Sequence, residues 1–373
     1  MVTASTPGRD SPEVAAASVV LPAGTRVGGY RIDGVLGRGG FGIVYYASRI
    51  ATGEPVALKE FFPATVAARR GSRIVPRRAE FHAALTKGVE GFLREARLLN
   101  ELSHPALVTV HEAWLESGTA YMAMTRYEGN TLRRLRESLS APPTQAQLRA
   151  WFEPVMDALL ELHARRVIHR DVSPDNVFIC RDGGAVLLDL GAARQILGGM
   201  TQALTMVLKP GFAPIEQYVD DGSLAQGRWT DVYGLAATLF FAVSGEAPVT
   251  ATSRIVRDTQ PDLATLPAAR HLSPTFCAGI MRGLALRAID RPKSVPEFKT
   301  LLGWTDATTA MARSLFEQSA APPNQAAPLE PQQVSRARVQ ADSSNRPRAA
   351  RLWVSVIVLL IVLVGLLFAW HLR

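Results

Sequence analysis

The polar run from His169 to Asn176 constrains this chain most, because apolar residues enclose it on both sides. Val167-Ile168 precede the run and Val177 to Ile179 follow it, a pattern that predicts a loop between short strands. An aspartate with an asparagine five residues later suits metal-dependent phosphoryl transfer. Asp171 can accept a proton from an attacking hydroxyl, and the amide oxygen of Asn176 can bind Mg²⁺. Loops are also rich in Asp, Asn and Pro for structural reasons, so other motifs must decide.

A glycine-rich turn lies nearer the start, with glycines at Gly37, Gly39 and Gly42. A dinucleotide-binding turn of this spacing opens a helix, because the pyrophosphate lies on the helix N-terminus. Here Ile43 to Tyr46 follow, and these β-branched and aromatic residues predict a strand. A glycine hairpin between strands can cover ATP phosphates with its N–H groups, while an ordinary glycine turn is the alternative.

A lysine and a glutamate could complete such a phosphate site. Lys59 ends a short strand pattern and could reach the phosphates, unless it is a solvated lysine at a sheet edge. Apolar residues at helical spacing from Val89 to Leu99 predict a helix, and Glu95 flanks its apolar face, where it could hold the lysine. The Arg-rich stretch from Glu60 to Lys87 is expected to be a partly ordered surface insert.

The pattern changes from strand to helix at Thr125 to Gly129, which we expect to be a hinge. Strands are predicted before it at residues 106–113 and 119–124, and helices after it at 148–162 and 232–243, the last with Thr230 or Asp231 as N-cap. An apolar strand at 185–188 leads into Asp189. An aspartate at a strand end before a glycine suits Mg²⁺, although ordinary Asp-x-Gly turns are common.

The formal net charge of +8 over 373 residues raises the question of nucleic acid binding. The arginine runs at 69–70, 77–78 and 346–351 have no interleaved aromatic residues to stack on bases. An acidic membrane surface or an acidic protein explains the charge at least as well, so we expect no nucleic acid partner. The two cysteines, Cys180 and Cys277, predict a reducing compartment without a disulfide framework.

The two ends of the chain differ in composition from the middle. Residues 1–24 are expected to be a disordered leader, and residues 304–351 a disordered juxtamembrane linker. Residues 352–370 carry no charge, and as a helix they would span about 28 Å, close to the hydrocarbon core of a bilayer. Trp353 and Trp370 lie at the ends, as interfacial aromatic residues do. This segment therefore predicts a transmembrane helix.

Together these motifs resemble the eukaryotic-type protein kinase superfamily, in the family's order, from about Tyr30 to Leu302. The stretches most similar to a bacterial serine/threonine kinase group are Glu60 to Pro63, Ser173 to Asn176 and Lys209 to Tyr218. The resemblance implies an α+β, two-lobed protein kinase fold, with a small β-rich N-lobe at residues 25–124 (insert 60–88) and a larger helical C-lobe at 125–303.

The resemblance also implies the site residues. Asp171 would be the catalytic base, Lys59 held by Glu95 would bind the α- and β-phosphates, and Asn176 and Asp189 would hold Mg²⁺. The nucleotide would lie against Leu36, Gly37, Gly39, Gly40, Gly42, Val44, Ala57, Lys59, Met124, Arg126 and Tyr127. Structural roles would fall to Asp231, which would hold the catalytic loop, and to Glu216 and Arg291, which would pair in the larger lobe.

The chain departs from the family at three positions. Leu190 replaces the usual Phe. Ser173 stands where a lysine usually contacts the γ-phosphate, and Lys209 stands where a threonine is usual. Because those two family residues both contact the catalytic aspartate, we expect Lys209 to enter the site, near Asp171 and Ser173, and to replace the missing lysine. A solvent-pointing Lys209 is the alternative.

We therefore expect a serine/threonine kinase that uses ATP and Mg²⁺ to phosphorylate protein substrates, with a possible transient homodimer for autophosphorylation. A nucleotide-binding pseudokinase scaffold at the membrane is the alternative, and a small-molecule kinase is a third reading. Arg170 would leave a positive charge beside the base, so Thr201 and Thr205 are expected phosphoacceptors that order the loop.

Arginines just before the apolar segment favour the cytoplasmic side, and a kinase needs cytoplasmic ATP. We expect a single-pass tail anchor in the cell inner membrane or plasma membrane, with a cytoplasmic kinase domain and no extracytoplasmic sensor. A removable lipid-anchor signal is the alternative for an apolar tail.

Overall fold

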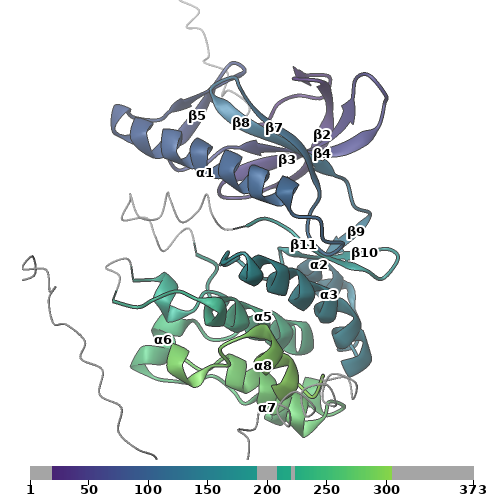
Figure 1. Ribbon diagram of the computed structural model, residues 1–373, viewed down its shortest axis with the longest axis vertical. Coiled ribbons are helices and arrows are strands. Elements are labelled where there is room, and N and C mark those ends of the chain that lie inside the picture. Colours follow the sequence, from purple (N-terminus) through teal and green to yellow (C-terminus); the bar gives the residue numbers. More distant parts are fainter. Residues whose placement is uncertain (1–18, 191–207, 220–222, 305–373) are drawn as a thin grey trace, which may run out of the picture. The chain divides into compact units, whose positions relative to one another are not determined.

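The computed structural model describes residues 19–190, 208–219 and 223–304 (Figure 1). The candidate phosphoacceptors Thr201 and Thr205, nearly all of the expected linker and the apolar segment 352–370 lie outside these ranges. Among the described residues, no helix has the length and apolar character needed to cross a membrane.

The first half of the described chain forms a six-stranded antiparallel sheet in the order β1-β2-β3-β4-β8-β7. Its strands are β1 (Arg26–Val27), β2 (Tyr30–Arg38), β3 (Gly42–Arg49), β4 (Pro55–Phe61), β7 (Val110–Glu116) and β8 (Thr119–Thr125). Helix α1 (His82–Glu101) packs against β7 and β8, as Figure 1 shows. Its buried face includes Phe92, Ala96 and Leu99, at the helical spacing that predicted this element. The helix is longer than predicted at both ends.

The predicted strand at 106–113 begins only at Val110. Leu107 instead forms a parallel bridge with Leu187, and Val108 N–H donates to the carbonyl of Leu187 at 3.2 Å. These apolar residues therefore join the first sheet to the second half of the chain.

The prediction of a partly ordered surface insert at 60–88 is wrong. The stretch forms a hairpin of β5 (Ala67–Arg70) and β6 (Arg73–Pro76), then the 3-10 turn η1 (Ala79–Phe81), and the first residues of α1. Glu60 is fully buried, and it accepts hydrogen bonds from Tyr45 (2.8 Å), Tyr121 (2.6 Å) and the Arg69 guanidinium. This buried carboxylate ties the hairpin to the sheet.

The predicted disordered leader is also wrong for its last residues. The backbone N–H of Leu21 donates to the Tyr45 hydroxyl at 3.2 Å, and Arg69 Nε donates to the carbonyl of Val19 at 2.8 Å. Leu21 itself is buried in the core, so residues 19–24 belong to the packed unit.

Helices make up most of the second half: α2 (Leu132–Ser138), α3 (Gln145–Ala164), α5 (Arg228–Ser244), α6 (Ala251–Val256), α7 (Pro274–Gly283) and α8 (Val295–Leu301). A small sheet, ordered β11-β10-β9, consists of β9 (Gly129–Thr131), β10 (Val177–Cys180) and β11 (Ala185–Leu187). Short 3-10 turns are η3 (Ile215–Gln217), η4 (Leu263–Thr265), η5 (Pro267–Ala269) and η6 (Ala288–Asp290). Helix α5 is buried on all sides from Thr230 to Val243, and it contacts α2, α3, α7 and α8 (Figure 1). It is the core around which this half packs.

Two local predictions fail at helix ends. Helix α5 is capped at Gly227 instead of Thr230 or Asp231, because the Thr230 hydroxyl lies inside the first turn and accepts from Gly227 N–H at 3.1 Å. The residues Val167-Ile168 are not a strand. The chain leaves α3 through Arg166, whose φ is +61°, and Val167 N–H still bonds the carbonyl of Leu162 at 2.9 Å.

Candidate active site

One buried aspartate holds the loop from His169 to Asn176. Asp231, in the first turn of α5, accepts from the backbone N–H groups of His169 (2.9 Å) and Arg170 (2.7 Å). Its carboxylate also contacts the His163 ring at 2.7 Å. Arg170 has a φ of +65°, a conformation that non-glycine residues seldom adopt. The carboxylate therefore stabilises a strained turn just before Asp171.

Asp171 and Asn176 lie side by side. The Asn176 amide nitrogen donates to the Asp171 carbonyl at 2.8 Å and to the Asp171 carboxylate. Both of these bonds use Nδ2, so the amide oxygen of Asn176 is directed elsewhere. Both side chains are more than nine-tenths buried, which fixes their geometry.

His169 links this loop to the strand end that carries Asp189. Its Nε2 donates to the Leu188 carbonyl at 3.0 Å, and its Nδ1 accepts from Asp171 N–H at 3.3 Å. The Leu188 N–H in turn donates to the Asn176 carbonyl at 2.8 Å. Burial lowers the pKa of His169 below its ordinary value, which agrees with a neutral ring that donates on one nitrogen and accepts on the other.

Lys59 joins residues from three parts of the chain. Its Nζ lies 2.7 Å from an Asp189 carboxylate oxygen and 3.7 Å from a Glu95 oxygen. The ammonium also lies 5.4 Å from the centre of the Phe92 ring on α1. Strand β4, helix α1 and the end of β11 thus meet at one charged cluster.

The glycine turn and several of the predicted nucleotide-binding residues lie on the strand of Lys59 or on the strands beside it. Gly37 pairs with Val44 across the β2-β3 hairpin, and Val44 pairs with Lys59. A Cβ at Gly42 would lie 2.7 Å from the Glu60 carbonyl, so only glycine fits there. Gly39 N–H closes the turn on the Gly42 carbonyl at 2.9 Å.

The other predicted nucleotide residues follow from the sheet register. Ala57 pairs with Met124 on β8, and both side chains are buried. Just beyond β8, the Arg126 guanidinium lies 5.8 Å from the Tyr46 ring centre, and the Tyr127 hydroxyl accepts from Thr109 N–H at 3.2 Å. Leu36 and Val44 pack against the core at its edge. A Cβ at Gly40 would have no atom of the described residues within 4 Å, so the tip of the glycine turn is open.

Lys209 reaches the loop from a segment far along the chain. Its Nζ lies 2.7 Å from Ser173 Oγ, 3.2 Å from Asn176 Oδ1 and 3.4 Å from Asp171 Oδ1. The structure thus shows the contact with Ser173 and Asp171 that the exchange of residue types predicted, and Lys209 does not point to solvent.

The donor set fits Mg²⁺. Asn176 offers an amide oxygen and Asp189 a carboxylate, the hard oxygen ligands that this ion prefers. Among the described residues, no group of three or more His, Cys, Asp or Glu forms a metal cage. Proteins usually bind Mg²⁺ through one or two carboxylates together with substrate phosphates.

Glu216 and Arg291 form a buried ion pair with contacts of 2.6 and 3.1 Å. Thr230 donates to the same carboxylate at 3.0 Å, and the guanidinium lies 4.9 Å from the Tyr233 ring centre. The pair joins η3 to the end of the helical half and to α5.

Sequence reasoning missed two contacts of the loop. Arg133 on α2 binds the Asp175 carboxylate at 2.7 and 3.1 Å, and Gln217 donates to the Arg170 carbonyl at 2.8 Å. No spacing or residue pattern in the sequence links these distant positions. Gln217 follows Glu216 directly, so the motif itself marked the segment but not the contact.

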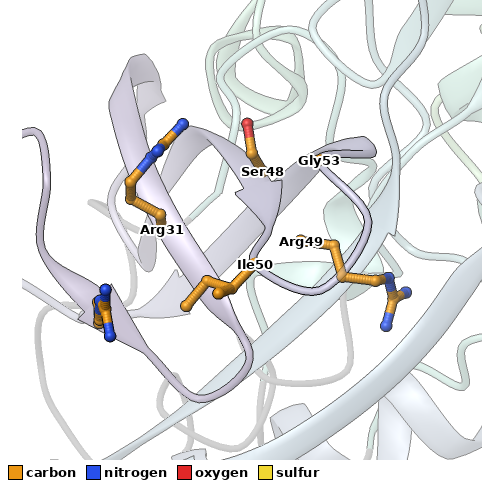
Figure 2. A pocket seen from close by; sticks show the side chains of 6 residues that line it. Arg31, Ser48, Arg49, Ile50 and Gly53 are labelled. Carbon is orange, nitrogen blue, oxygen red and sulfur yellow. The ribbon is translucent and has the colours of Figure 1, made fainter.

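A shallow hollow on the first sheet lies outside this site, and it is lined by Arg26, Arg31, Ser48, Arg49, Ile50 and Gly53. The side chains of Arg31 and Arg49 point in different directions (Figure 2). Asp33 pairs with Arg31 at 3.1 Å, and Glu54 and Glu112 pair with Arg49. The hollow therefore does not gather positive charge for one ligand.

Comparison with known proteins agrees with this geometry. The family model described as "Protein kinase domain" matches residues 30–277. Over 75% of its own length, the chain is 28% identical to the serine/threonine-protein kinase Pkn1 of Myxococcus xanthus. Over 72% of its own length, it is 27% identical to the serine/threonine-protein kinase PknL of Mycobacterium tuberculosis. It spans 38% and 68% of the lengths of these two relatives. A solved structure titled "PpkA-294 apo form" is 37% identical, with a TM-score of 0.70, over 76% of this chain and all of that one.

Proposed function

This chain belongs to the protein kinase family, and on that premise we propose that it transfers the γ-phosphate of ATP to serine and threonine hydroxyls of proteins. Its relatives are bacterial serine/threonine kinases. The predicted fold class is confirmed for the described residues, which form a β-rich N-lobe and a helical C-lobe. The family typically uses ATP and Mg²⁺, and the donors Asn176 and Asp189 fit that metal.

The observation that carries this proposal is the convergence of Lys59, Glu95 and Asp189 in one cluster, with Asp171 and Asn176 in a second linked to it by His169. Lys59 would neutralise charge on the α- and β-phosphates, and Glu95 holds it in place. Bound Mg²⁺ would add positive charge to the phosphates. Catalysis would then depend on positioning and electrostatic stabilisation, since the transfer needs no covalent chemistry from the protein.

In the proposed reaction, Asp171 orients the acceptor hydroxyl and takes its proton. The hydroxyl oxygen bonds to the γ-phosphorus while the bond from that phosphorus to the β,γ-bridging oxygen breaks, and ADP leaves with the electron pair. A pseudokinase scaffold would not need Asp171 and Asn176 packed in this geometry.

The test is phosphate transfer by the purified full chain, with ATP labelled at the γ-phosphate, Mg²⁺ and a mixture of casein and histone. Label should appear as phosphoserine or phosphothreonine. Lys59→Met should lower the rate by about 10²-fold or more, because it removes the charge that faces the phosphates. Lys87→Met is the matched control, since Lys87 lies exposed on α1. A wild-type protein that transfers no label would reject the proposal.

We propose further that Thr201 and Thr205 accept phosphate, although both lie outside the described residues. Support comes from Arg170, whose buried Nε has no hydrogen-bond partner among the residues that the structure describes. A phosphothreonine carries a charge of about −1.5 to −2 and would pair with that guanidinium. Mass spectrometry of active protein should find one of them phosphorylated. A Thr201→Ala, Thr205→Ala variant with full activity would reject this proposal.

A membrane anchor at residues 352–370 is also proposed, from the uncharged sequence alone. The preceding arginines support a cytoplasmic kinase domain in the inner or plasma membrane. The full chain should sediment with membranes after high-salt washing, and a chain cut at residue 304 should not. Protease added outside intact cells should leave the kinase domain whole, and digestion there would contradict the orientation.

A further inference from the structure

The ammonium of Lys209 lies among three groups of the catalytic loop. It donates to Ser173 Oγ at 2.7 Å and to Asn176 Oδ1 at 3.2 Å, and it lies 3.4 Å from Asp171 Oδ1. Asp175 Oδ2 is 3.9 Å away. The two carboxylates give this position a negative surrounding, so a positive charge is stabilised there. The side chain is 21% exposed, so one side of it stays accessible to a ligand.

The backbone of Lys209 is anchored by the turn that follows it. Its carbonyl accepts from the N–H groups of Phe212 (3.0 Å) and Ala213 (3.1 Å). Phe212 is buried and contacts the Phe241 ring on α5 edge-on, with ring centres 6.1 Å apart. Gly211 has a φ of +85°, and a Cβ there would lie 2.6 Å from the Pro248 carbonyl. Lys209 therefore starts from a backbone fixed to the helical core.

A second contact fixes the catalytic loop on the other side of the Lys209 ammonium, at Asp175. Arg133 holds the Asp175 carboxylate with two hydrogen bonds, and its guanidinium lies 5.8 Å from the Phe212 ring centre. The loop and the segment that carries Lys209 thus share Arg133 as a common support. Ser173 is fully buried beneath the Lys209 ammonium, so a longer side chain at 173 and Lys209 would compete for the same space.

We propose that Lys209 is a catalytic residue of this kinase, which delivers from the segment 208–219 the ammonium that contacts the transferring phosphoryl group. The inference rests on the proposed function. Lys209 would neutralise charge on the γ-phosphate oxygens while Asp171 takes the hydroxyl proton, and Ser173 would hold the ammonium in place. A lysine serves here because it carries a compact charge on a flexible stem. Catalysis would consequently require this segment to be folded.

Lys209 could have two other roles with the same contacts, and each predicts a different effect of its substitution. As a purely structural residue, Lys209 would affect stability and turnover together. As an inhibitory plug, it would occupy the Asn176 oxygen and block Mg²⁺, so its removal would raise activity. These outcomes can be separated by measuring turnover, nucleotide affinity and unfolding on the same variants.

The experiment compares full-length wild type, Lys209→Thr, Lys209→Arg and Lys209→Thr with Ser173→Lys. Lys299→Thr is the matched control, because this lysine pairs with Asp157 at the surface, away from the site. Kinetics would give kcat and KM, calorimetry the Kd of Mg²⁺-ATP, and thermal scans the unfolding midpoint. We expect Lys209→Thr to lower kcat by about 10²–10³-fold, as loss of one transition-state donor does. The Kd should change by less than about 3-fold, as expected of a transition-state contact.

Lys209→Arg should retain part of the activity, and Ser173→Lys added to Lys209→Thr should recover about 10-fold or more by returning an ammonium to the site. The inference is rejected if an active wild type keeps its turnover in Lys209→Thr, if activity rises, or if kcat falls while the Kd of Mg²⁺-ATP rises by a similar factor. The same holds if the double variant recovers nothing while its unfolding midpoint matches that of wild type. An inactive wild type would reject the proposed function instead.

Discussion

At the scale of the residue, His169 makes the site sensitive to pH. Burial lowers its pKa, so between the folded and the unfolded pKa the unfolded chain binds more protons. The free energy of unfolding should therefore be highest above about pH 6.5, the ordinary value for histidine, and fall as the pH drops, by at most about 1.4 kcal/mol per pH unit. Protonation would also cost the acceptor that Asp171 N–H uses.

Urea unfolding of wild type and His169→Gln from pH 5 to 7.5 checks this. The wild type should lose more stability below pH 6.5 than the variant does, and exposed His82→Gln should follow the wild type. Parallel curves for wild type and His169→Gln would contradict a depressed pKa.

Single residues also show which contacts of the site could be predicted from the sequence and which could not. The position of Lys209 was predictable because, in the family that the chain resembles, the residues at positions 173 and 209 both contact the catalytic aspartate. The Arg133–Asp175 pair was not, since nothing in residue type or spacing connects α2 to the loop. Asp231 was foreseen both as a loop anchor and as a possible cap, and the structure shows that its carboxylate binds the loop's backbone N–H groups.

At the scale of the element, the amino-acid composition gave a wrong prediction for the β5-β6 hairpin. Its arginines suggested a solvated surface, but the Arg69 guanidinium is buried against Glu60. A charge count cannot show that a carboxylate nine residues earlier will neutralise a buried arginine. The hairpin leads through η1 into α1, which carries Glu95, so its packing positions one partner of Lys59.

Arg69→Ala should therefore destabilise the fold by about 3–5 kcal/mol, because it leaves the Glu60 carboxylate buried without its ion pair. Arg70→Ala, at the exposed neighbouring position, should change stability by less than about 0.5 kcal/mol. Denaturant unfolding of both variants measures the difference. Equal effects at the two positions would show that the Glu60–Arg69 pair does not hold the hairpin.

At the scale of the whole molecule, the motifs predicted the kinase fold because each one requires a specific neighbour. Lys59 needs a carboxylate on a helix, and the structure brings Glu95 to it. The contact of Lys59 with Asp189, which was predicted only as a Mg²⁺ ligand, was not foreseen. The parallel bridge between Leu107 and Leu187 also joins β11 to the first half of the chain. No pattern in the sequence predicted this bridge. The membrane segment rests on sequence alone.

The central claim is that Asp171 makes this chain an active kinase, not a nucleotide-binding scaffold. The most direct measurement pairs phosphate transfer with the Kd of Mg²⁺-ATP for full-length wild type and Asp171→Asn, with exposed Asp182→Asn as control. Loss of a general base should lower transfer by about 10²–10⁴-fold. The Kd should stay close to that of wild type and of Asp182→Asn. Equal transfer by wild type and Asp171→Asn, or nucleotide binding without transfer by the wild type, would contradict the account.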